Sequence, residues 1–403
     1  MPRKVLDLEL SADMKPIWGI ERYECLHILV RYHGKPFSWL YFNNGTHQPS
    51  VSAESLRETI IEQLWNKMGF AAIMDQMHYK APDNSRLPPI SVVVCTRDRT
   101  AQLANCLQSL MTIDYPDYEI IIVDNAPSNE KTAQLAVDLP VRYVREDHPG
   151  LDWARNRGLS EARHGIIAFT DDDAMPDRYW LRAIASAFAE PDVMAVTGLV
   201  VPAELETTAQ INFEIGYGGM GKGFRRRIFN RKGLTTRELL WSSNFGVGAN
   251  MAFRRQLFEV IHPFDVALDV GTPSKGGGDI EMFHRILAHG YTLLYEPAAV
   301  VWHVHRRSNS SLRRQIHSNG CAFGAYLLTC ARNRTVSRLS LLHFSIYEWL
   351  GWWIVRRLLR PNGFSRRLIL NELMGATLSP FAFRKALRQA KYLTDSRRDT
   401  ISL

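Results

Sequence analysis

Three consecutive aspartates, Asp171, Asp172 and Asp173, closely follow an apolar run at residues 166–169. A buried strand that ends in like charges is unfavourable unless a positive group compensates them. A divalent cation holding a phosphorylated ligand would supply that charge, because Mg²⁺ binds carboxylates together with substrate phosphates. The alternative is a solvated turn in which Asp173 or Asp177 caps the next helix. The triplet alone leaves both interpretations open.

His303 and His305 lie two residues apart in the segment 300–305. If this segment is a short strand, both imidazoles point to the same face. Two imidazoles on one face are a candidate metal site, although pairs of surface histidines are also common. The spacing alone therefore does not decide between the two.

Asp279 follows three glycines, residues 276–278, and precedes an amphipathic segment that ends at Gly290. We expect Asp279 at the N-cap of this helix, where Asp is a favoured residue. The glycines suggest that the backbone also approaches a ligand closely. An ionised carboxylate there could accept a proton at neutral pH, so Asp279 is either a simple cap or a general base.

A candidate anion site lies in the segment 148–159, where Gly150 makes a turn into a predicted helix. We expect Arg155 in the first turn, with its guanidinium and the helix amides facing the same way. A surface arginine near a helix cap is the alternative.

Four apolar runs alternate with amphipathic segments, at residues 90–95, 119–123, 141–144 and 166–170. This pattern predicts a mostly parallel sheet with helices on both faces. Ligands of such sheets bind beyond the carboxyl ends of the strands. Polar clusters at residues 96–99, 124–125 and 171–173 each follow a predicted strand end. The sequence therefore predicts one site at that edge, which favours the ligand-binding interpretation of the aspartates.

The predicted sheet continues beyond these strands. A helix is expected from Asp177 and a further strand at residues 193–200. Residues 201–240 contain several glycines beside a run of arginines, which predicts an irregular, mobile loop.

Residues 1–87 are expected to form a small, separate α+β unit. The segments 25–30 and 37–42 flank a turn and predict a hairpin. A helix is expected from Ser52 to about Met68, and residues 81–89 are a predicted linker. No residue of this unit suggests chemistry.

The 403-residue chain has a net charge of +8, which is unevenly distributed. Residues 331–403 contain 14 Lys and Arg against 4 Asp and Glu, a balance of +10, so the rest of the chain carries −2. This argues against a nucleic-acid groove in the main domain and favours an anionic surface as a partner of the C-terminal end. Five cysteines without metal-ligand spacing, and a start without an apolar signal segment, predict a cytoplasmic protein.

The C-terminal region, residues 311–403, is expected to be helical and basic. Its longest apolar run, residues 339–355, is too short and polar to predict a membrane span. Trp349, Trp352 and Trp353 precede a cluster of arginines, which favours an interfacial helix on the inner face of the cell membrane. The alternative is that the tryptophans pack on the body of the protein while the arginines stay solvated.

Six motifs, in order, resemble those of family 2 glycosyltransferases with the GT-A fold. They are Val-Val-Val-Cys-Thr-Arg-Asp-Arg at 92–99, Ile-Val-Asp-Asn at 122–125, Ala-Arg-Asn at 154–156, the Asp-x-Asp of Asp171 and Asp173, Gly-Asp at 278–279 and Val-Trp-His at 301–303. The resemblance covers about residues 88–310. It implies a GT-A catalytic domain that transfers a sugar from a nucleotide-sugar, most often a UDP-sugar, with inversion of configuration.

The resemblance also implies which residues bind the donor. Thr96, Arg97 and Asp124 would hold the nucleotide base, and Arg155 would lie on the phosphate side. Asp171 would meet the ribose, and Asp172 belongs to the same nucleotide-sugar-binding group. The segment around Asn250 resembles the one that lines the donor sugar and the acceptor.

Metal binding and base catalysis are assigned in the same way. Asp173 would bind Mn²⁺ or Mg²⁺, and His303 would be a further ligand, with His305 as the alternative. Asp279 would be the general base that deprotonates the acceptor hydroxyl. The family usually has Glu-Asp where this chain has Gly278-Asp279, so Glu281 is the alternative base.

These roles describe an in-line displacement at the anomeric carbon. The metal and Arg155 would stabilise the departing nucleoside diphosphate. A single carboxylate base implies inversion, because a retaining double displacement needs a second carboxylate as nucleophile. The expected acceptor is a glycan or a lipid-linked sugar, and no nucleic acid is expected as a partner.

Two rival functions stay open. A nucleotidyltransferase that makes nucleotide-sugars would require a glycine-rich basic loop after the first strand, where residues 96–99 contain no glycine. A non-catalytic protein that binds sugar-nucleotides would show substitutions at the base or metal positions, and only Gly278 departs from the pattern.

Overall fold

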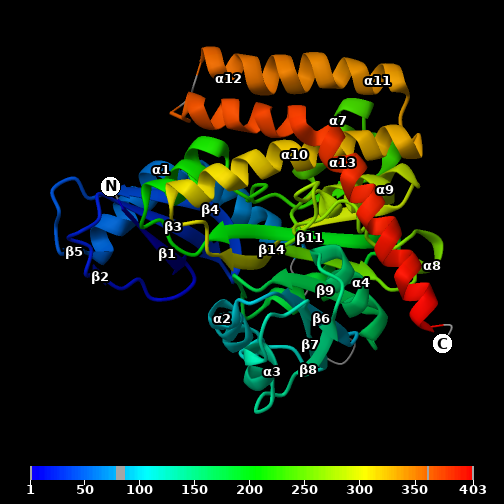
Figure 1. Cartoon of the computed structure of the whole chain (residues 1–403). Coiled ribbons are helices and arrows are strands. Elements are labelled where there is room, and N and C mark those ends of the chain that lie inside the picture. The colour runs from blue at the N-terminus through cyan, green and yellow to red at the C-terminus, as the bar shows by residue number, and fades with distance from the viewer. Residues whose placement is uncertain (1, 79–86, 361–362, 402–403) are drawn as a thin grey trace.

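The computed structural model describes residues 2–78, 87–360 and 363–401. The strands of its main sheet are β6 (Ile90–Thr96), β7 (Tyr118–Asn125), β8 (Arg142–Glu146), β9 (Ile166–Asp171), β10 (Ala174–Pro176), β11 (Val193–Pro202), β12 (Arg227–Phe229), β13 (Asn250–Arg254) and β14 (Thr292–His303). Among the described residues this sheet has nine strands, in the order β10-β14-β11-β13-β9-β6-β7-β8, with β12 paired to β14 (Figure 1). Each strand predicted from the sequence is therefore present.

Most strands of this sheet run in one direction. β8, β7, β6 and β9 are parallel neighbours, and β11 is parallel to β14. β13 lies between β9 and β11 and is antiparallel to both, so the two parallel sets share a direction. β10 and β12 are antiparallel to β14. The predicted mostly parallel sheet is confirmed.

Helices cover both faces of the sheet because its central strands are apolar on both faces. The helices around it are α2 (Thr100–Leu110), α3 (Lys131–Ala136), α4 (Leu151–Glu161), α5 (Trp180–Ala187), α8 (Leu257–Val260) and α9 (Gly278–Ala288). Every residue of β6 is buried: Val92 packs with Leu103 of α2, whereas Val93 belongs to the opposite cluster with α4 and α9. Gly158 of α4 lies so close to Val93 that a Cβ atom there would collide with it.

The N-terminal unit has its own small sheet and its own apolar cluster. Its elements are β1 (Arg3–Glu9), β2 (Ile17–Trp18), β3 (Cys25–Tyr32), β4 (Lys35–Asn43), β5 (Ser50–Val51) and α1 (Ala53–His78). β3 and β4 form the predicted hairpin, and β1 is parallel to β3. α1 continues past Met68, so the helix is longer than predicted. The predicted linker at 81–89 falls largely outside the described residues.

A buried arginine joins this unit to the main sheet. Arg31 of β3 donates to Asp7 Oδ1 of β1 and to Asp177 Oδ2, both at 2.8 Å. The prediction that Asp177 starts a helix was wrong, because α5 begins at Trp180. Asp177 lies between β10 and α5 and binds the N-terminal unit instead.

The C-terminal region is helical, as predicted. Its elements are α10 (Asn309–Asn333), α11 (Arg338–His343), the π-helical segment η5 (Phe344–Val355), α12 (Arg356–Leu359) and α13 (Arg366–Ile401). The run from α11 to α12 lies along α13, and α10 lies between these helices and the sheet (Figure 1). Within the described ranges, no helix combines the length and apolar character needed to cross a membrane.

The tryptophans of η5 do not all face solvent. Trp349 is buried, and Trp353 donates its indole N–H to Glu372 Oε1 of α13 at 2.9 Å. Trp352 is exposed. The expectation of three interfacial tryptophans was therefore wrong for two of them, which pack against the body of the protein.

The segment 201–240 is not the irregular loop predicted from its glycines. It contains short elements, namely α6 (Thr208–Ile211), the π-helical η2 (Asn212–Tyr217), β12, the 3-10 helix η3 (Arg231–Gly233) and α7 (Thr236–Leu240). Phe213 and Leu240 are buried and pack with Leu312 and Ile316 of α10. The prediction failed because the segment is ordered by contact with a helix whose packed residues lie 72 to 103 positions later in the chain.

Candidate active site

Asp171, Asp173 and His303 meet at one end of the sheet. Asp171 ends β9 and His303 ends β14, while Asp173 lies in the turn between β9 and β10. His303 is opposite Ala174 in the β10–β14 pairing, which brings its imidazole beside Asp173, with His303 Nε2 and Asp173 Oδ1 3.2 Å apart. One ligand atom from each of the three residues lies within 4.8 Å of the others. The structure thus brings together the two predicted metal ligands and adds Asp171.

This group of side chains is suited to a hard divalent ion. Two carboxylates and an imidazole are ligands that Mn²⁺ accepts, and carboxylates are those that Mg²⁺ prefers. Burial opposes the charge on Asp173, but its hydrogen bond to His303 and the charges of His303, Arg306 and Arg99 outweigh this and lower its pKa. Burial and the charge of Asp173 raise the pKa of Asp171. The crowding of like charges that the sequence predicted is therefore present.

Two arginines that sequence reasoning left without a role also contact the aspartates. Arg99 Nη1 lies 3.0 Å from Asp172 Oδ1 and 3.2 Å from Asp173 Oδ2. Arg306 Nη1 lies 3.3 Å from Asp173 Oδ2. Arg99 is the last residue of the polar cluster after β6, and Arg306 directly follows His305. These positions next to predicted site residues were the only hint in the sequence that the two arginines belong to the site.

His303 is held by a second histidine and a glutamate. His303 Nδ1 and His305 Nδ1 are 3.2 Å apart, and His305 Nε2 is 3.0 Å from Glu214 Oε2. If the N–H of His305 Nε2 donates to Glu214, its Nδ1 accepts the N–H of His303 Nδ1. In this tautomer His303 Nε2 would offer its lone pair to a bound ion, in place of the hydrogen bond that it makes with Asp173 Oδ1 in this structure. Partners of this kind commonly orient metal ligands.

Glu214 was not predicted from the sequence, because it lies in the segment that was taken for a loop. His305, the alternative metal ligand, turns toward Glu214 through its Nε2. The geometry therefore places His303, and not His305, in the group that could hold an ion, while His305 contacts His303 from the other side.

Thr96 and Asp172 are engaged with each other. Thr96 Oγ1 donates to Asp172 Oδ2 at 2.8 Å, and both residues are buried. Burial raises the pKa of Asp172 to about 6. Both were expected to bind the donor, but in this structure their polar atoms serve to fix the turn after β9. Arg97 is half exposed, and its nearest carboxylate is that of Asp98 at 4.0 Å.

Asp124 presents one free acceptor atom at the end of β7. Its Oδ2 accepts the hydroxyl of Tyr143 at 3.0 Å, whereas its buried Oδ1 has no partner among the described residues. Burial raises the pKa of this carboxyl. A buried acceptor without a partner is costly unless a ligand satisfies it. The role of Asp124 in holding a nucleotide base stays a prediction, for which this atom is available.

Arg155 is buried in the second turn of α4, not in the first turn as predicted. Its Nη1 donates to Asp152 Oδ1 at 3.0 Å. A Cβ atom at Gly248 would lie between Arg155 and Asp279, 3.1 Å from Asp279 Oδ2, so this glycine lets the two side chains approach each other. Arg155 therefore lies beside the expected general base.

Asp279 is not the N-cap of α9, because that position belongs to Gly277. Asp279 lies in the first turn, where its Oδ2 accepts the backbone N–H of Gly248 at 2.8 Å. Glu281, the alternative base, is buried and ion-paired with Arg285 at 2.9 Å. Asp279 is thus the carboxylate of this helix that lies beside Arg155.

Gly278 is required by a neighbouring carboxylate. A Cβ atom at this position would collide with Asp152 Oδ2, which is buried and has no partner among the described residues. Burial raises the pKa of Asp152 to about 7, although Arg155 opposes the shift. The departure from the usual Glu-Asp pair therefore has a steric cause in this chain.

Asn250 has no atom left for a ligand in this conformation. Its side-chain amide donates to the carbonyls of Leu199 at 3.0 Å and Ala299 at 2.8 Å. Its Oδ1 accepts the indole N–H of Trp180 at 2.9 Å. The expectation that Asn250 lines the donor site fails here, because the residue joins β13 to its neighbours.

Comparison with known proteins adds the family. The model of glycosyl transferase family 2 matches residues 91–261. These residues form a family 2 glycosyltransferase domain. The match includes β6 to β9 and the three aspartates, whereas Asp279 and His303 lie beyond it. Together with the sheet order, it confirms the predicted GT-A-type α/β domain.

Several curated proteins similar to this chain are named as glycosyltransferases. Glycosyltransferase AglE of Haloferax volcanii is 24% identical over 265 residues, which are 64% of this chain and 80% of that protein. The pre-mycofactocin glycosyltransferase of Mycobacterium tuberculosis is 22% identical over 57% of this chain and 45% of that protein. The glucosyl-dolichyl phosphate glucuronosyltransferase of Haloferax volcanii is 23% identical over 44% of this chain and 56% of that protein. The chain spans about half the length of the last two.

Among solved structures, the mannosyltransferase PcManGT from Pyrobaculum calidifontis was determined in complex with GDP-mannose and Mn²⁺. It superposes with a TM-score of 0.46 over 83% of this chain and 88% of that chain, at 17% sequence identity.

Proposed function

We propose that this glycosyltransferase moves a sugar from a nucleotide-diphosphate sugar, a UDP-sugar by resemblance, to an acceptor hydroxyl with inversion of configuration. The observation that carries the proposal is the meeting of Asp171, Asp173 and His303 within 4.8 Å at the edge of a family 2 domain. We assign Mn²⁺ or Mg²⁺ to this group. When bound, the ion would neutralise the charge that develops on the departing diphosphate.

Asp279 is the proposed general base. It is held by the N–H of Gly248 and lies next to Arg155 on the opposite side of Gly248. A carboxylate fixed in this way can take the proton of an acceptor hydroxyl as the hydroxyl attacks. One base and one displacement would invert the anomeric configuration.

The remaining proposed contacts concern the donor. The free Oδ1 of Asp124 would accept an N–H of the nucleotide base. Arg97 directly follows Thr96, the β6 residue paired with Asp124, and would contact the base from there. Arg155 would lie on the phosphate side. Its ion pair with Asp152 would have to coexist with the donor, because both groups are buried.

Donor hydrolysis with Mn²⁺ tests the assignment. We would measure nucleoside diphosphate release across UDP-, GDP- and dTDP-sugars for the full chain, Asp173→Ala and Asp279→Asn. The proposal expects Asp173→Ala to lose donor and metal binding together. It expects Asp279→Asn to bind the donor and lose transfer by at least about a hundredfold. Unchanged turnover in both variants would overturn the site.

The proposed acceptor is a glycan or a lipid-linked sugar at an anionic membrane surface, to which a cytoplasmic enzyme would bind peripherally. The C-terminal helices support this because they expose many large apolar side chains, among them Leu339, Leu342, Ile346, Tyr347, Leu359, Leu370, Met374, Leu378 and Phe381. One relative is named for action on a dolichyl phosphate lipid. Flotation with anionic liposomes tests membrane binding, and full-length protein that stays at the bottom of the gradient would refute it.

A further inference from the structure

Three C-terminal segments enclose an apolar groove that the proposed transfer chemistry does not use. It is formed by α10, by α11 with η5, and by α13, and its volume is about 360 Å³. Side chains from all three segments line it, including Phe323, Leu327, Leu342, Trp349 and Pro380. Leu342 and Pro380 are themselves exposed, so the groove opens to the surface.

The two hydroxyl groups in this lining are already satisfied. Ser345 Oγ donates to the carbonyl of Leu341, and Ser379 Oγ donates to the carbonyl of Ala376, both at 2.7 Å. Pro380 has no N–H, so the carbonyl of Ala376 lacks its usual helical donor, and Ser379 replaces it. The groove therefore offers apolar contact and few hydrogen bonds, which suits a hydrocarbon ligand.

Basic side chains lie at the groove and further along α13. Arg338 lines it, and Arg384, Lys385 and Arg388 are exposed on α13 beyond Pro380. The two acidic residues nearest in these helices are engaged: Glu348 pairs with Arg237 at 2.6 Å, and Glu372 is buried. A ligand that combines a hydrocarbon chain with an anionic head group would match both features.

The groove lies one helix away from the proposed base. Ala322 of α10 packs on the glycines before Asp279, so that a Cβ atom at Gly277 would be 3.1 Å from the Ala322 carbonyl. The next two residues of α10, Phe323 and Gly324, line the groove. α10 therefore separates the groove from the N-terminal end of α9.

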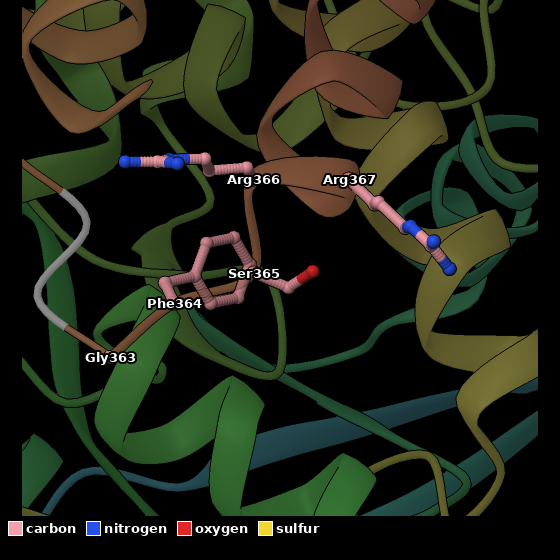
Figure 2. Close-up of a pocket in the computed structure, with 5 residues that line it drawn as sticks. All are labelled: Gly363, Phe364, Ser365, Arg366 and Arg367. Atoms are coloured by element: carbon pink, nitrogen blue, oxygen red, sulfur yellow. The ribbon is translucent and has the colours of Figure 1, made fainter. Parts of the chain in front are cut away.

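A second hollow, of about 710 Å³, is lined by residues 363–367 at the start of α13. Figure 2 shows the side chains of Arg366 and Arg367 pointing in opposite directions, so they do not converge on one anion. This hollow therefore does not compete as a place for the ligand's head group.

We propose that the groove binds the hydrocarbon chain of a phosphate-bearing, lipid-linked acceptor. The inference rests on the proposed function, because it assigns the acceptor of that reaction. The chain of the lipid would lie between α10, α11–η5 and α13, with its phosphate near Arg338. The sugar at the far end would extend around α10 toward Asp279.

Calorimetric titration of the full chain with farnesyl phosphate, kept below its micelle concentration, tests this proposal. Inorganic phosphate and farnesol are the comparison ligands. We expect farnesyl phosphate to bind more tightly than farnesol and inorganic phosphate not to bind. Ala376→Trp, which fills the groove, should weaken binding by at least about tenfold. Leu342→Asp should do the same from an exposed position where folding is little affected.

Leu370→Ser is the matched control, because Leu370 is exposed on α13 outside the groove lining. Equal binding by all three variants, or no binding by the unmodified chain, would overturn the proposal. The proposal would also be overturned if the unmodified chain formed a dimer that Leu342→Asp dissociates, because a second copy would then occupy the groove. Binding of a UDP-sugar with Mn²⁺, measured on the same samples, separates the two claims: its loss alone counts against the proposed function and not against the groove.

Discussion

At the scale of single residues, a buried carboxylate of α4 restricts which residue can stand at position 278 of α9. Asp152 Oδ2 occupies the space that a side chain at position 278 would need. We expect Gly278→Ala to lower the free energy of unfolding by about 1–2 kcal/mol, because overpacking costs more than the gain in helix propensity. Chemical denaturation would measure this. Gly165→Ala is the control, since a Cβ atom there meets nothing within 4 Å, and an equal loss in both variants would contradict the steric explanation.

Glu214 is expected to act on the metal through two histidines. Glu214→Gln leaves the side-chain shape unchanged but weakens the partner that holds His305, which in turn orients His303. Loss of such a partner typically lowers metal affinity by about 10- to 100-fold. Titration of Mn²⁺ followed by electron paramagnetic resonance would measure it. Glu204→Gln, at the neighbouring pair with Arg307, should leave the affinity unchanged, and a matching loss there would contradict the role of Glu214.

The sequence located this site because the chemistry-bearing residues follow strand ends, whose position in a parallel sheet is predictable. It did not reveal which atoms remain free. Asn250 and Thr96 are polar residues at the expected edge, yet their polar atoms are consumed by Trp180 and Asp172. Such pairings join segments about 70 residues or more apart, so no local pattern contains them.

At the scale of elements, α9 and α10 are joined by a buried histidine. His284 lies 2.8 Å from both Tyr326 Oη and Thr335 Oγ1, and burial lowers its pKa to about 4. In the unfolded chain the imidazole has its ordinary pKa of 6.5, so it takes up a proton before the buried imidazole does. The free energy of unfolding therefore falls as the pH drops from the unfolded pKa toward the folded pKa. We expect His284 to lower the free energy of unfolding by about 2 kcal/mol as the pH falls from 6.5 to 5.

Urea unfolding at pH 7 and pH 5 would show this loss. His284→Gln keeps hydrogen-bonding capacity without titrating, so its stability should change less over the same pH interval. A pH dependence equal to that of the unmodified chain would show that other groups are responsible.

The strands of the main sheet were predictable because both their faces are buried, which requires continuous apolar runs such as that of β6. The short elements of residues 208–240 were not, because their order comes from packing against α10. A helix start was also displaced: α5 begins at Trp180, and Asp177 before it pairs with Arg31 of the N-terminal unit.

At the scale of the whole molecule, an N-terminal unit and a C-terminal helical layer are both attached to the glycosyltransferase domain (Figure 1). Arg31 is a buried link to the N-terminal unit, through Asp7 and Asp177. Removal of one partner of a buried ion pair typically costs about 3–5 kcal/mol. We expect Arg31→Gln to weaken the packing of the N-terminal unit on the main domain by a free energy of this order. The cost should be somewhat smaller because water can solvate the half-exposed Asp7 carboxylate.

Limited proteolysis with and without urea would reveal early release of the N-terminal unit in Arg31→Gln. Arg22→Gln is a suitable control, because Arg22 is largely exposed and pairs with Glu206 at 3.3 Å. Identical cleavage of the two variants would show that Arg31 does not hold the unit in place.

We propose that Asp171, Asp173 and His303 bind one ion together with a nucleoside diphosphate. Pulsed electron paramagnetic resonance of Mn²⁺ and UDP bound to the full chain would test this. We expect a ¹⁴N coupling from a histidine ligand that disappears in His303→Ala, and loss of tight Mn²⁺ binding in Asp173→Ala. Tight binding that survives in Asp173→Ala, or a spectrum without histidine nitrogen in the unmodified chain, would contradict it.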